Sequence, residues 1–206
     1  MGKKIIKYTL TIIVVAFLAY NSVYFKKLSD VKAAASKTFD PAAYARTYLD
    51  KKLLPAANNA PDIDQLINEV KSNPGKAFKA YAHTLNIGNT RFFMAKGEGT
   101  ITNIDESDIY ITTTGKQNIK IATEYIFGNA LRDAPGIITV NDFTNSMDLN
   151  NVSAEVNKLV RGEILPPFKS KAKKGDNISF AGAFELNQEH LNLNNIEIIP
   201  VNLIIK

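Results

Sequence analysis

An uncharged run from Tyr8 to Phe25 sets the start of this chain apart from the remainder. A helix over this run is about 27 Å long, which is close to the thickness of the hydrocarbon core of a bilayer. Tyr8, Tyr20 and Tyr24 lie toward its two ends, where a ring with a polar tip is favoured. Lysines flank the run on both sides, and a helix buried in a protein core does not need them. The run therefore predicts a transmembrane helix that anchors the chain.

The whole net positive charge lies beside this run. The formal charge of the chain is +5, and five lysines flank the run with no acidic residue among them: Lys3, Lys4, Lys7, Lys26 and Lys27. Basic residues that precede a membrane helix favour the cytoplasm, so the body is expected on the exported side. From residue 30 onward the acidic and basic residues are equal in number. Because a neutral body lacks the basic patch of nucleic-acid-binding proteins, we expect no nucleic acid as a partner.

The uncharged run and its flanking charges predict that the chain is divided into two parts. Residues 1–29 are expected to form a cytoplasmic tail and membrane anchor, and residues 30–206 a single exported domain. An uncleaved anchor is favoured over a signal peptide, because Phe17 is too large for the small-residue cleavage site that would end at Ala19. The chain has no cysteine, which excludes a disulfide framework.

The first part of the exported domain, residues 30–88, contains three helix-start signals. Asp40 and Asn73 each precede a proline, as an N-cap residue does when proline occupies the first helical position. Asp62 precedes a set of apolar residues spaced to share one face of a helix: Ile63, Leu66, Ile67 and Val70. We expect short helices here that pack on another part of the domain.

The second part, residues 89–206, changes to the alternating pattern of strands. Apolar residues alternate in three places: Ile109 and Ile111; Ile119, Ile121 and Tyr125; Ile178, Phe180 and Phe184. Gly97 and Gly99 lie in an earlier strand and predict a bulge or sharp bend there. The last strand is expected from about Asn195 to Ile205, with Pro200 at an edge or a bulge.

One helix interrupts these strands. Its apolar face contains Val152, Val156, Leu159 and Val160, with Asn150 or Asn151 as the expected cap and Pro166–Pro167 as the expected end. A bent first strand and a helix between strands 3 and 4 are typical of an OB-type barrel, which binds oligonucleotides or oligosaccharides on one face. We therefore predict an α+β fold: an N-terminal transmembrane helix, short helices and an OB-like five-stranded barrel. A small α+β sandwich of another topology is the alternative.

A polar, turn-rich segment follows the third predicted strand and offers candidate ligand-binding residues: Arg132, Asp133, Asn141, Asp142, Phe143 and Asn145. The planar guanidinium of Arg132 can clamp a carboxylate or stack on a ring. Acids, amides and one aromatic ring together suit the hydroxyl groups of a sugar. Alternatively, Arg132 pairs internally with Asp133 or Asp142 and fixes a long loop.

The segments FGNALRDA, NDFTN, KGDNISFAGAFEL and IIPVNL resemble the family of predicted periplasmic lipoproteins (domain of unknown function 2291) over most of residues 40–205. The resemblance implies an exported, membrane-attached protein encoded beside sugar-uptake transporters of the ATP-binding-cassette (ABC) type. It implies no activity and no catalytic residues. The chain lacks the family's lipid-anchored cysteine, which leaves anchoring to the apolar helix. The expected location is the bacterial inner membrane, crossed once, with the body in the periplasm.

Other signals in the chain do not predict catalysis or metal binding. His83 and His190 are far apart in sequence and lack the spacing of zinc ligands. The oxygen-rich turn from Asn103 to Asp108 lacks the spacing of a calcium loop. No nucleophile with a neighbouring base and no phosphate-binding glycine loop can be identified. We expect no metal, no cofactor, no catalytic residue and no enzymatic activity.

Two functions remain open from the sequence. The first is a membrane-anchored periplasmic binding or accessory module, associated with a sugar-type ABC uptake system and binding a carbohydrate. The second is a structural or assembly protein whose helices at residues 40–85 contact a transporter subunit or the membrane. An exposed lysine cluster would contribute to that contact: Lys169, Lys171, Lys173 and Lys174.

Overall fold

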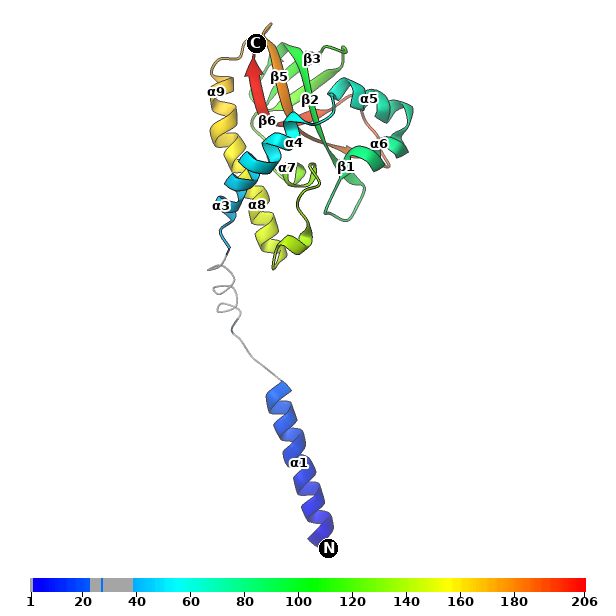
Figure 1. The fold of residues 1–206 in the computed structure, drawn as a ribbon, viewed down its shortest axis with the longest axis vertical. Coiled ribbons are helices and arrows are strands. Elements are labelled where there is room, and N and C mark those ends of the chain that lie inside the picture. Colours follow the sequence, from blue (N-terminus) through cyan, green and yellow to red (C-terminus); the bar gives the residue numbers. More distant parts are fainter. Residues whose placement is uncertain (1, 23–26, 28–38) are drawn as a thin grey trace. The chain divides into compact units, whose positions relative to one another are not determined.

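The computed structural model describes residues 2–22, 27 and 39–206 (Figure 1). The chain divides into two compact units, Met1–Asp40 and Pro41–Lys206. Helix α1, Gly2–Ser22, belongs to the first unit. No helix within the described residues has the length and apolar character that crossing a membrane requires, so the expected transmembrane helix is not found among them. The last part of the predicted span, residues 23–25, and the predicted boundary at residues 29 and 30 lie outside the described residues.

The second unit begins with the helices that the capping signals predicted. A helical run comprises α3 (Pro41–Tyr48), the π-helical turn η1 (Leu49–Leu53) and α4 (Leu54–Asn58). Helices α5 (Ile63–Ser72) and α6 (Pro74–Tyr81) follow. The Asp62 side chain accepts hydrogen bonds from the backbone N–H groups of Asp64 and Gln65, and Asn73 accepts one from Lys76. The predicted caps Asp62 and Asn73 are thereby confirmed, and the third predicted helix start, Asp40-Pro41, coincides with the start of α3 at Pro41.

In residues 39–206 the sheet has six strands, one more than predicted. They are β1 (Ala82–His83), β2 (Thr90–Ile104), β3 (Asp108–Thr113), β4 (Asn118–Ala122), β5 (Asn177–Asn187) and β6 (Glu197–Ile205). The additional strand is β1, whose two residues are too few to show an alternating pattern. The order is β1-β2-β3-β4-β6-β5, and β2 also pairs with β5. The five longer strands therefore form a closed circuit, in which each strand pairs with two others of the five.

Strand β2 is the longest strand and pairs with three others. It pairs antiparallel with β5 from Thr90 to Thr100, with β1 near Phe93, and with β3 from Gly99 onward. A Cβ atom on Gly99 would lie 2.6 Å from the carbonyl oxygen of Thr112, so only glycine fits where β2 approaches β3 this closely. The two glycines predicted to bend the first strand thus lie where β2 changes partners.

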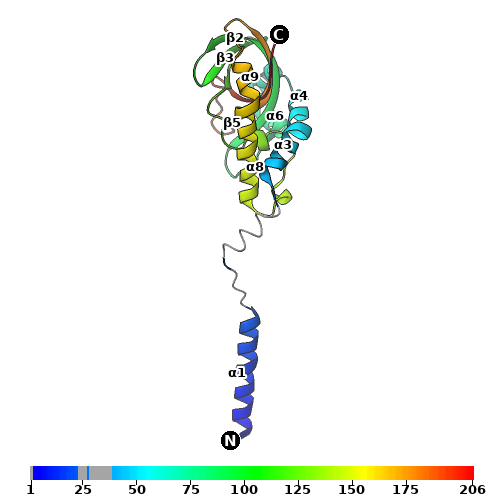
Figure 2. The same cartoon turned by 90° about the vertical axis from the view of Figure 1, so that its left-hand side faces the viewer.

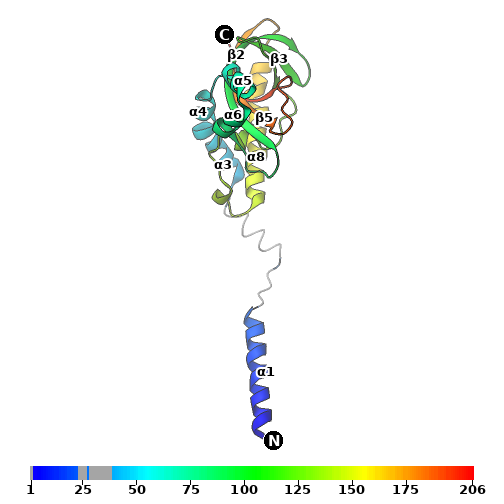
Figure 3. The same ribbon diagram turned by 90° about the vertical axis from the view of Figure 1, so that its right-hand side faces the viewer.

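A long helical segment connects β4 to β5, as predicted. It comprises α8 (Ser146–Leu159), the π-helical turn η3 (Val160–Ile164) and α9 (Leu165–Lys169), which run along one side of the sheet (Figure 2). Helices α5 and α6 lie on the opposite side (Figure 3). Two details differ from the prediction. The cap of α8 is Asn145 rather than Asn150 or Asn151, and Pro166–Pro167 lie in the first turn of α9, where proline does not interrupt a helix.

The core forms where α5 and α6 cover the sheet. Phe93 of β2 stacks on Phe184 of β5 with ring centroids 5.3 Å apart, and it meets the edge of Phe78 from α6 at 5.1 Å. The expected irregularity at Pro200 is confirmed, because the register of β5 and β6 shifts between Ala181 and Gly182. Strand β4 ends at Ala122, so Tyr125 lies outside the strand that was expected to contain it.

Candidate functional site

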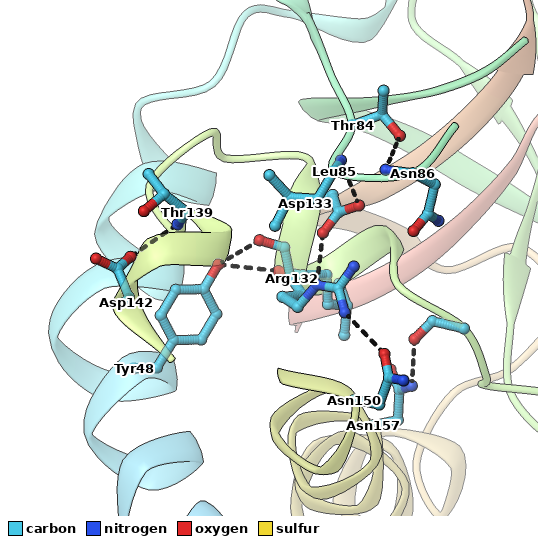
Figure 4. A network of polar contacts seen from close by, with 12 residues as sticks. Tyr48, Thr84, Leu85, Asn86, Arg132, Asp133, Thr139, Asp142, Asn150 and Asn157 are labelled. Atoms are coloured by element: carbon cyan, nitrogen blue, oxygen red, sulfur yellow. Dashed lines mark hydrogen bonds and ion pairs between the residues drawn. The ribbon is translucent and has the colours of Figure 1, made fainter. Parts of the chain in front are cut away.

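Arg132 and Asp133 lie in the short helix α7 (Ala130–Asp133) and are buried. The Nε atom of Arg132 donates to Oδ1 of Asp133 at 2.6 Å, and Nη1 lies 3.4 Å from Oδ1 of Asn150 on α8 (Figure 4). The second oxygen of Asp133 accepts a hydrogen bond from the backbone N–H of Leu85 at 3.0 Å. The Tyr48 hydroxyl lies 3.1 Å from the carbonyl oxygen of Arg132. This is the internal pairing that the sequence allowed as the alternative to ligand binding.

The other four candidate residues lie between α7 and α8 and mostly serve local structure. Asp142 accepts a hydrogen bond from the backbone N–H of Thr139 at 2.7 Å and closes the 3-10 turn η2 (Val140–Asp142). Phe143 meets the ring of Tyr44 at 5.4 Å, edge to face. Asn145 caps α8, and Asn141 is exposed. None of the six candidates lines any of the pockets described below, and their binding role stays a prediction.

The largest of these pockets, about 560 Å³, lies between the α4–α5 connection and the bend of β2. Several of its polar groups already have partners within the fold. Lys96 donates to the carbonyl oxygen of Asn58 at 2.8 Å. Asp64 accepts from the Thr113 hydroxyl at 2.5 Å and from the backbone N–H of Gly115 at 2.7 Å. These bonds hold α5 against the β3–β4 hairpin, so this pocket is better explained as a structural junction.

A second pocket, about 420 Å³, combines aromatic and polar walls, and we call it the Tyr125 pocket. Its walls come from three segments: residues 125–130, the end of β5 at 184–187, and residues 190–199 of the β5–β6 loop and β6. Tyr125 and Phe127 line it although they are 68% and 64% exposed. Large apolar side chains exposed beside a polar pocket are typical of ligand-binding surfaces rather than of structural loops.

Side chains of α8 and η3 hydrogen-bond to the loop that carries these aromatic residues. Asn157 of α8 donates to the carbonyl oxygen of Gly128 at 2.9 Å, and Gly128 has the positive φ of 77° that turns the chain there. Arg161 of η3 donates to the carbonyl oxygen of Ile126, and its guanidinium lies over the Phe127 ring at 5.4 Å. The loop backbone and the Phe127 ring are therefore set in place without a ligand, which reduces the entropy that binding would cost.

The opposite wall of the Tyr125 pocket carries amides and carboxylates. Asn187, Asn192 and Asn195 supply amide groups, and Glu185 and Glu197 supply carboxylates. Burial raises the pKa of Glu197, as do the nearby carboxylates of Asp108 and Glu185, while Lys120 opposes them. Such carboxylates accept hydrogen bonds from hydroxyl groups when ionised. The wall thus favours hydroxyl-rich neutral ligands over anions.

The alternation of Ile119, Ile121 and Tyr125 predicts a strand, so this pattern does not indicate the pocket. One available signal was the asparagine-rich stretch of the β5–β6 loop, from Asn187 to Asn195. Another is the segment FGNA, which is also part of the family resemblance. Neither signal shows by itself that two segments about 60 residues apart in the chain meet across one pocket; that follows from the sheet topology.

The model of the family described as predicted periplasmic lipoprotein (DUF2291) matches residues 13–204. The chain belongs to this family. The predicted family resemblance is therefore confirmed. The family is described as one of predicted periplasmic lipoproteins, a description that indicates a periplasmic, membrane-associated location. No curated protein matches the chain significantly.

Among solved structures, the chain resembles the crystal structure of an OB-fold protein from Thermotoga maritima. The two are 28% identical, with a TM-score of 0.72, and the match covers 82% of this chain and 99% of the other. The predicted relationship to OB-folds is thus supported, within a mixed α+β fold whose described sheet has six strands.

OB-folds bind ligands on the face of their second and third strands and with the neighbouring loops. In this chain these strands correspond to β3 and β4, and a groove of about 390 Å³ lies there. Tyr110, Thr112 and Lys120 line it together with Asn194 and Asn195. The Lys120 ammonium lies 5.3 Å from the centre of the Tyr110 ring and 3.3 Å from Oδ2 of Asp108. Because Asn195 lines both cavities, this groove borders the Tyr125 pocket.

Proposed function

We propose that this member of the predicted periplasmic lipoprotein family is a non-catalytic module that binds a neutral carbohydrate in the Tyr125 pocket. The observation that carries the proposal is the pair of exposed rings, Tyr125 and Phe127, opposite a wall of amides and carboxylates. A sugar ring presents an apolar C–H face to an aromatic side chain and hydroxyl groups at its edge. Amides and carboxylates pair with those hydroxyl groups. The bordering groove on β3 and β4 gives room for a second sugar unit.

We further propose that the protein serves a sugar-type ABC uptake system from the outer face of the bacterial inner membrane. The uncharged run Tyr8–Phe25 with its flanking lysines supports a single-pass anchor with the body in the periplasm. The sequence contains no cysteine that could carry a lipid. Under this proposal the protein needs no metal or cofactor, binds no nucleic acid and has no enzymatic activity.

Titration of the full-length protein in mild detergent with neutral mono- and oligosaccharides, followed by isothermal calorimetry, tests the binding proposal. Tyr125→Ala is expected to weaken binding by about five- to tenfold, because a stacking contact worth about 1–1.5 kcal/mol is lost. Val140→Ala is the matched control, since Val140 is an exposed apolar residue outside the pocket. If none of the sugars binds, or if Tyr125→Ala binds as tightly as the wild type, the proposal is wrong.

The alternative is an assembly protein that contacts a transporter subunit without binding a small ligand. Exposed apolar side chains at Val140 and Met147 favour such a contact, as does the exposed lysine cluster Lys169, Lys171, Lys173 and Lys174. Co-purification from membranes in mild detergent separates the two functions. A stoichiometric partner that is lost in Met147→Lys, without any sugar binding by the wild type, favours assembly.

A further inference from the structure

The carboxylate wall of the Tyr125 pocket has no cationic side chain to match it. Glu185 of β5 and Glu197 of β6 are its two acidic residues, and neither lysine nor arginine lies among the described residues that line the pocket. Neither carboxylate has a hydrogen-bond or ion-pair partner in the part of the chain that the structure describes. Both therefore keep their full capacity to accept hydrogen bonds from a ligand.

The pairing of β5 with β6 places these two carboxylates opposite one another. Ala183 of β5 pairs with Ile199 of β6, and Glu185 and Glu197 lie two residues beyond this pair on their antiparallel strands. Because alternate residues of a strand share one face, both side chains project from the same side of the sheet. Like charges in such a position repel each other and destabilise the pairing of the strands. A cation bound between them would remove this repulsion.

Lys120 lies beside this wall but is engaged elsewhere. It pairs with Glu197 in the ladder between β4 and β6, yet its side chain lines the bordering groove and not the Tyr125 pocket. Its ammonium lies 3.3 Å from Oδ2 of Asp108 and 5.3 Å from the centre of the Tyr110 ring. The positive charge that matches Glu185 and Glu197 is therefore left for a ligand to supply.

Tyr125 and Asn187 provide contacts for the remainder of such a ligand. Tyr125 has neither a ring contact nor a hydrogen bond with another described residue, so its exposed ring can stack on the face of a sugar. The side-chain oxygen of Asn187 accepts the backbone N–H groups of Glu189 and His190 at 2.9 and 3.0 Å. Its amide N–H groups are left to donate to sugar hydroxyl groups.

We propose that the Tyr125 pocket prefers an amino sugar, whose ammonium group lies between the carboxylates of Glu185 and Glu197. This inference rests on the proposed function, because it takes the same pocket as a carbohydrate site, and it narrows the class of ligand. A neutral sugar makes the ring and hydroxyl contacts alone. An ammonium group adds charge-assisted hydrogen bonds from up to three N–H groups, so the amino sugar binds more tightly. N-acetylation removes the charge and two of these N–H groups, and with them the preference.

The test compares D-glucosamine, D-galactosamine and D-mannosamine, each with its parent hexose and its N-acetyl derivative. Calorimetric titration of the full-length protein in mild detergent at about pH 7, where a primary amine is mostly protonated, measures the affinities. At least one amino sugar should bind about tenfold more tightly than both of its neutral counterparts. Because salt screens charges, this preference should shrink when sodium chloride is raised from about 0.05 M to about 0.5 M.

Two substitutions test the carboxylates, and a third is the matched control. Glu197→Gln and Glu185→Gln each replace one charge by an amide of nearly the same shape, and each should reduce the tenfold preference to about threefold or less. Glu189→Gln should keep the preference, because Glu189 is exposed in the same β5–β6 loop and does not line the pocket. The ratio of two affinities is measured on the same folded protein, so a loss of stability does not change it. An unchanged preference in both Glu197→Gln and Glu185→Gln would overturn the inference.

The outcomes distinguish this inference from the function on which it rests. If hexoses bind and no amino sugar binds more tightly than its neutral counterparts, the preference is wrong and the proposed function holds. If neither the neutral nor the amino sugars bind, both are wrong. Measurable binding of amino sugars alone would support the inference and correct the neutral ligand proposed above.

Discussion

Arg132 and Asp133 are neighbours in sequence and form a buried ion pair, with Nε of Arg132 2.6 Å from Oδ1 of Asp133. The pair also connects two other elements. Asp133 accepts a hydrogen bond from the backbone of Leu85, which follows β1, and Arg132 reaches Asn150 on α8. The arginine whose guanidinium could clamp a ligand carboxylate therefore pairs internally, and the pair holds the segment after β1, α7 and α8 together.

Replacing one member of this pair should destabilise the fold strongly. Asp133→Asn leaves the buried guanidinium of Arg132 without a counter-charge, and we expect the free energy of unfolding to fall by about 3–5 kcal/mol. Urea denaturation of the full-length protein in mild detergent, followed by circular dichroism, measures this. Glu163→Gln is the control, since it breaks the exposed ion pair with Arg46 and should have a much smaller effect. Equal losses in the two variants would contradict the structural role of the buried pair.

Gly99 should tolerate no side chain. The Cβ atom of Gly99→Ala would lie 2.6 Å from the carbonyl oxygen of Thr112, a backbone atom that cannot rotate away. We expect the free energy of unfolding to fall by about 1–3 kcal/mol. Gly162→Ala provides the control, because nothing lies within 4 Å of its added Cβ and alanine stabilises a helical position by up to about 1 kcal/mol. Urea denaturation should show a lower free energy of unfolding for Gly99→Ala and an unchanged or higher one for Gly162→Ala. An unchanged free energy of unfolding in Gly99→Ala would contradict the close approach of β2 and β3.

The cap of α8 can be located by two substitutions. The Asn145 side chain accepts the backbone N–H of Asp148 at 2.9 Å, so Asn145→Ala should cost about 1 kcal/mol of stability. Asn151→Ala should cost nothing, because Asn151 lies within the helix and alanine is the better helix former. Thermal unfolding measured by circular dichroism compares the two. A larger loss in Asn151→Ala would place the start of the helix where the sequence alone suggested it.

Glu197 should make stability depend on pH. Burial raises the pKa of its carboxyl in the folded state, and the Asp108 and Glu185 carboxylates raise it further, so the folded state binds its proton more tightly than the unfolded state does. The resulting stabilisation is fully present below the unfolded pKa of about 4.5 and is lost as the pH rises through the folded pKa.

Denaturation curves from about pH 4 to pH 8 measure this dependence. Relative to the wild type, Glu197→Gln should gain stability as the pH rises and then level off above the folded pKa. Glu185→Gln should show part of the same trend, because it removes one of the charges that raise the pKa of Glu197. A difference between Glu197→Gln and the wild type that stays constant across this range would contradict the raised pKa.

Features that depend on neighbouring residues were predictable from the sequence. Asp62 and Asn73 cap their helices through bonds to residues two or three positions further on, so a local pattern suffices. The helical segment between β4 and β5 was predicted from its apolar face, of which Val152, Val156 and Val160 are fully buried.

Features that depend on distant residues were not predictable in this way. Strand β1 has two residues and exists because Ala82 and His83 pair with Phe93 and Phe92. Asn145 caps α8 five or six residues before the predicted Asn150 or Asn151, because the apolar face that indicates the helix begins only at Val152. Tyr125 was assigned to a strand because alternation alone cannot show where β4 loses its partner.

Strand β2 waits for its main partner while the polypeptide is being synthesised. One edge of β2, from Thr90 to Thr100, bonds only to β5, which the ribosome adds more than 70 residues later. Until Asn177–Asn187 has been synthesised, that edge carries unpaired backbone groups beside apolar side chains such as Phe93 and Ala95. Truncated or stalled chains are therefore prone to join one another edge to edge, and the finished chain removes that hazard by supplying its own final partner.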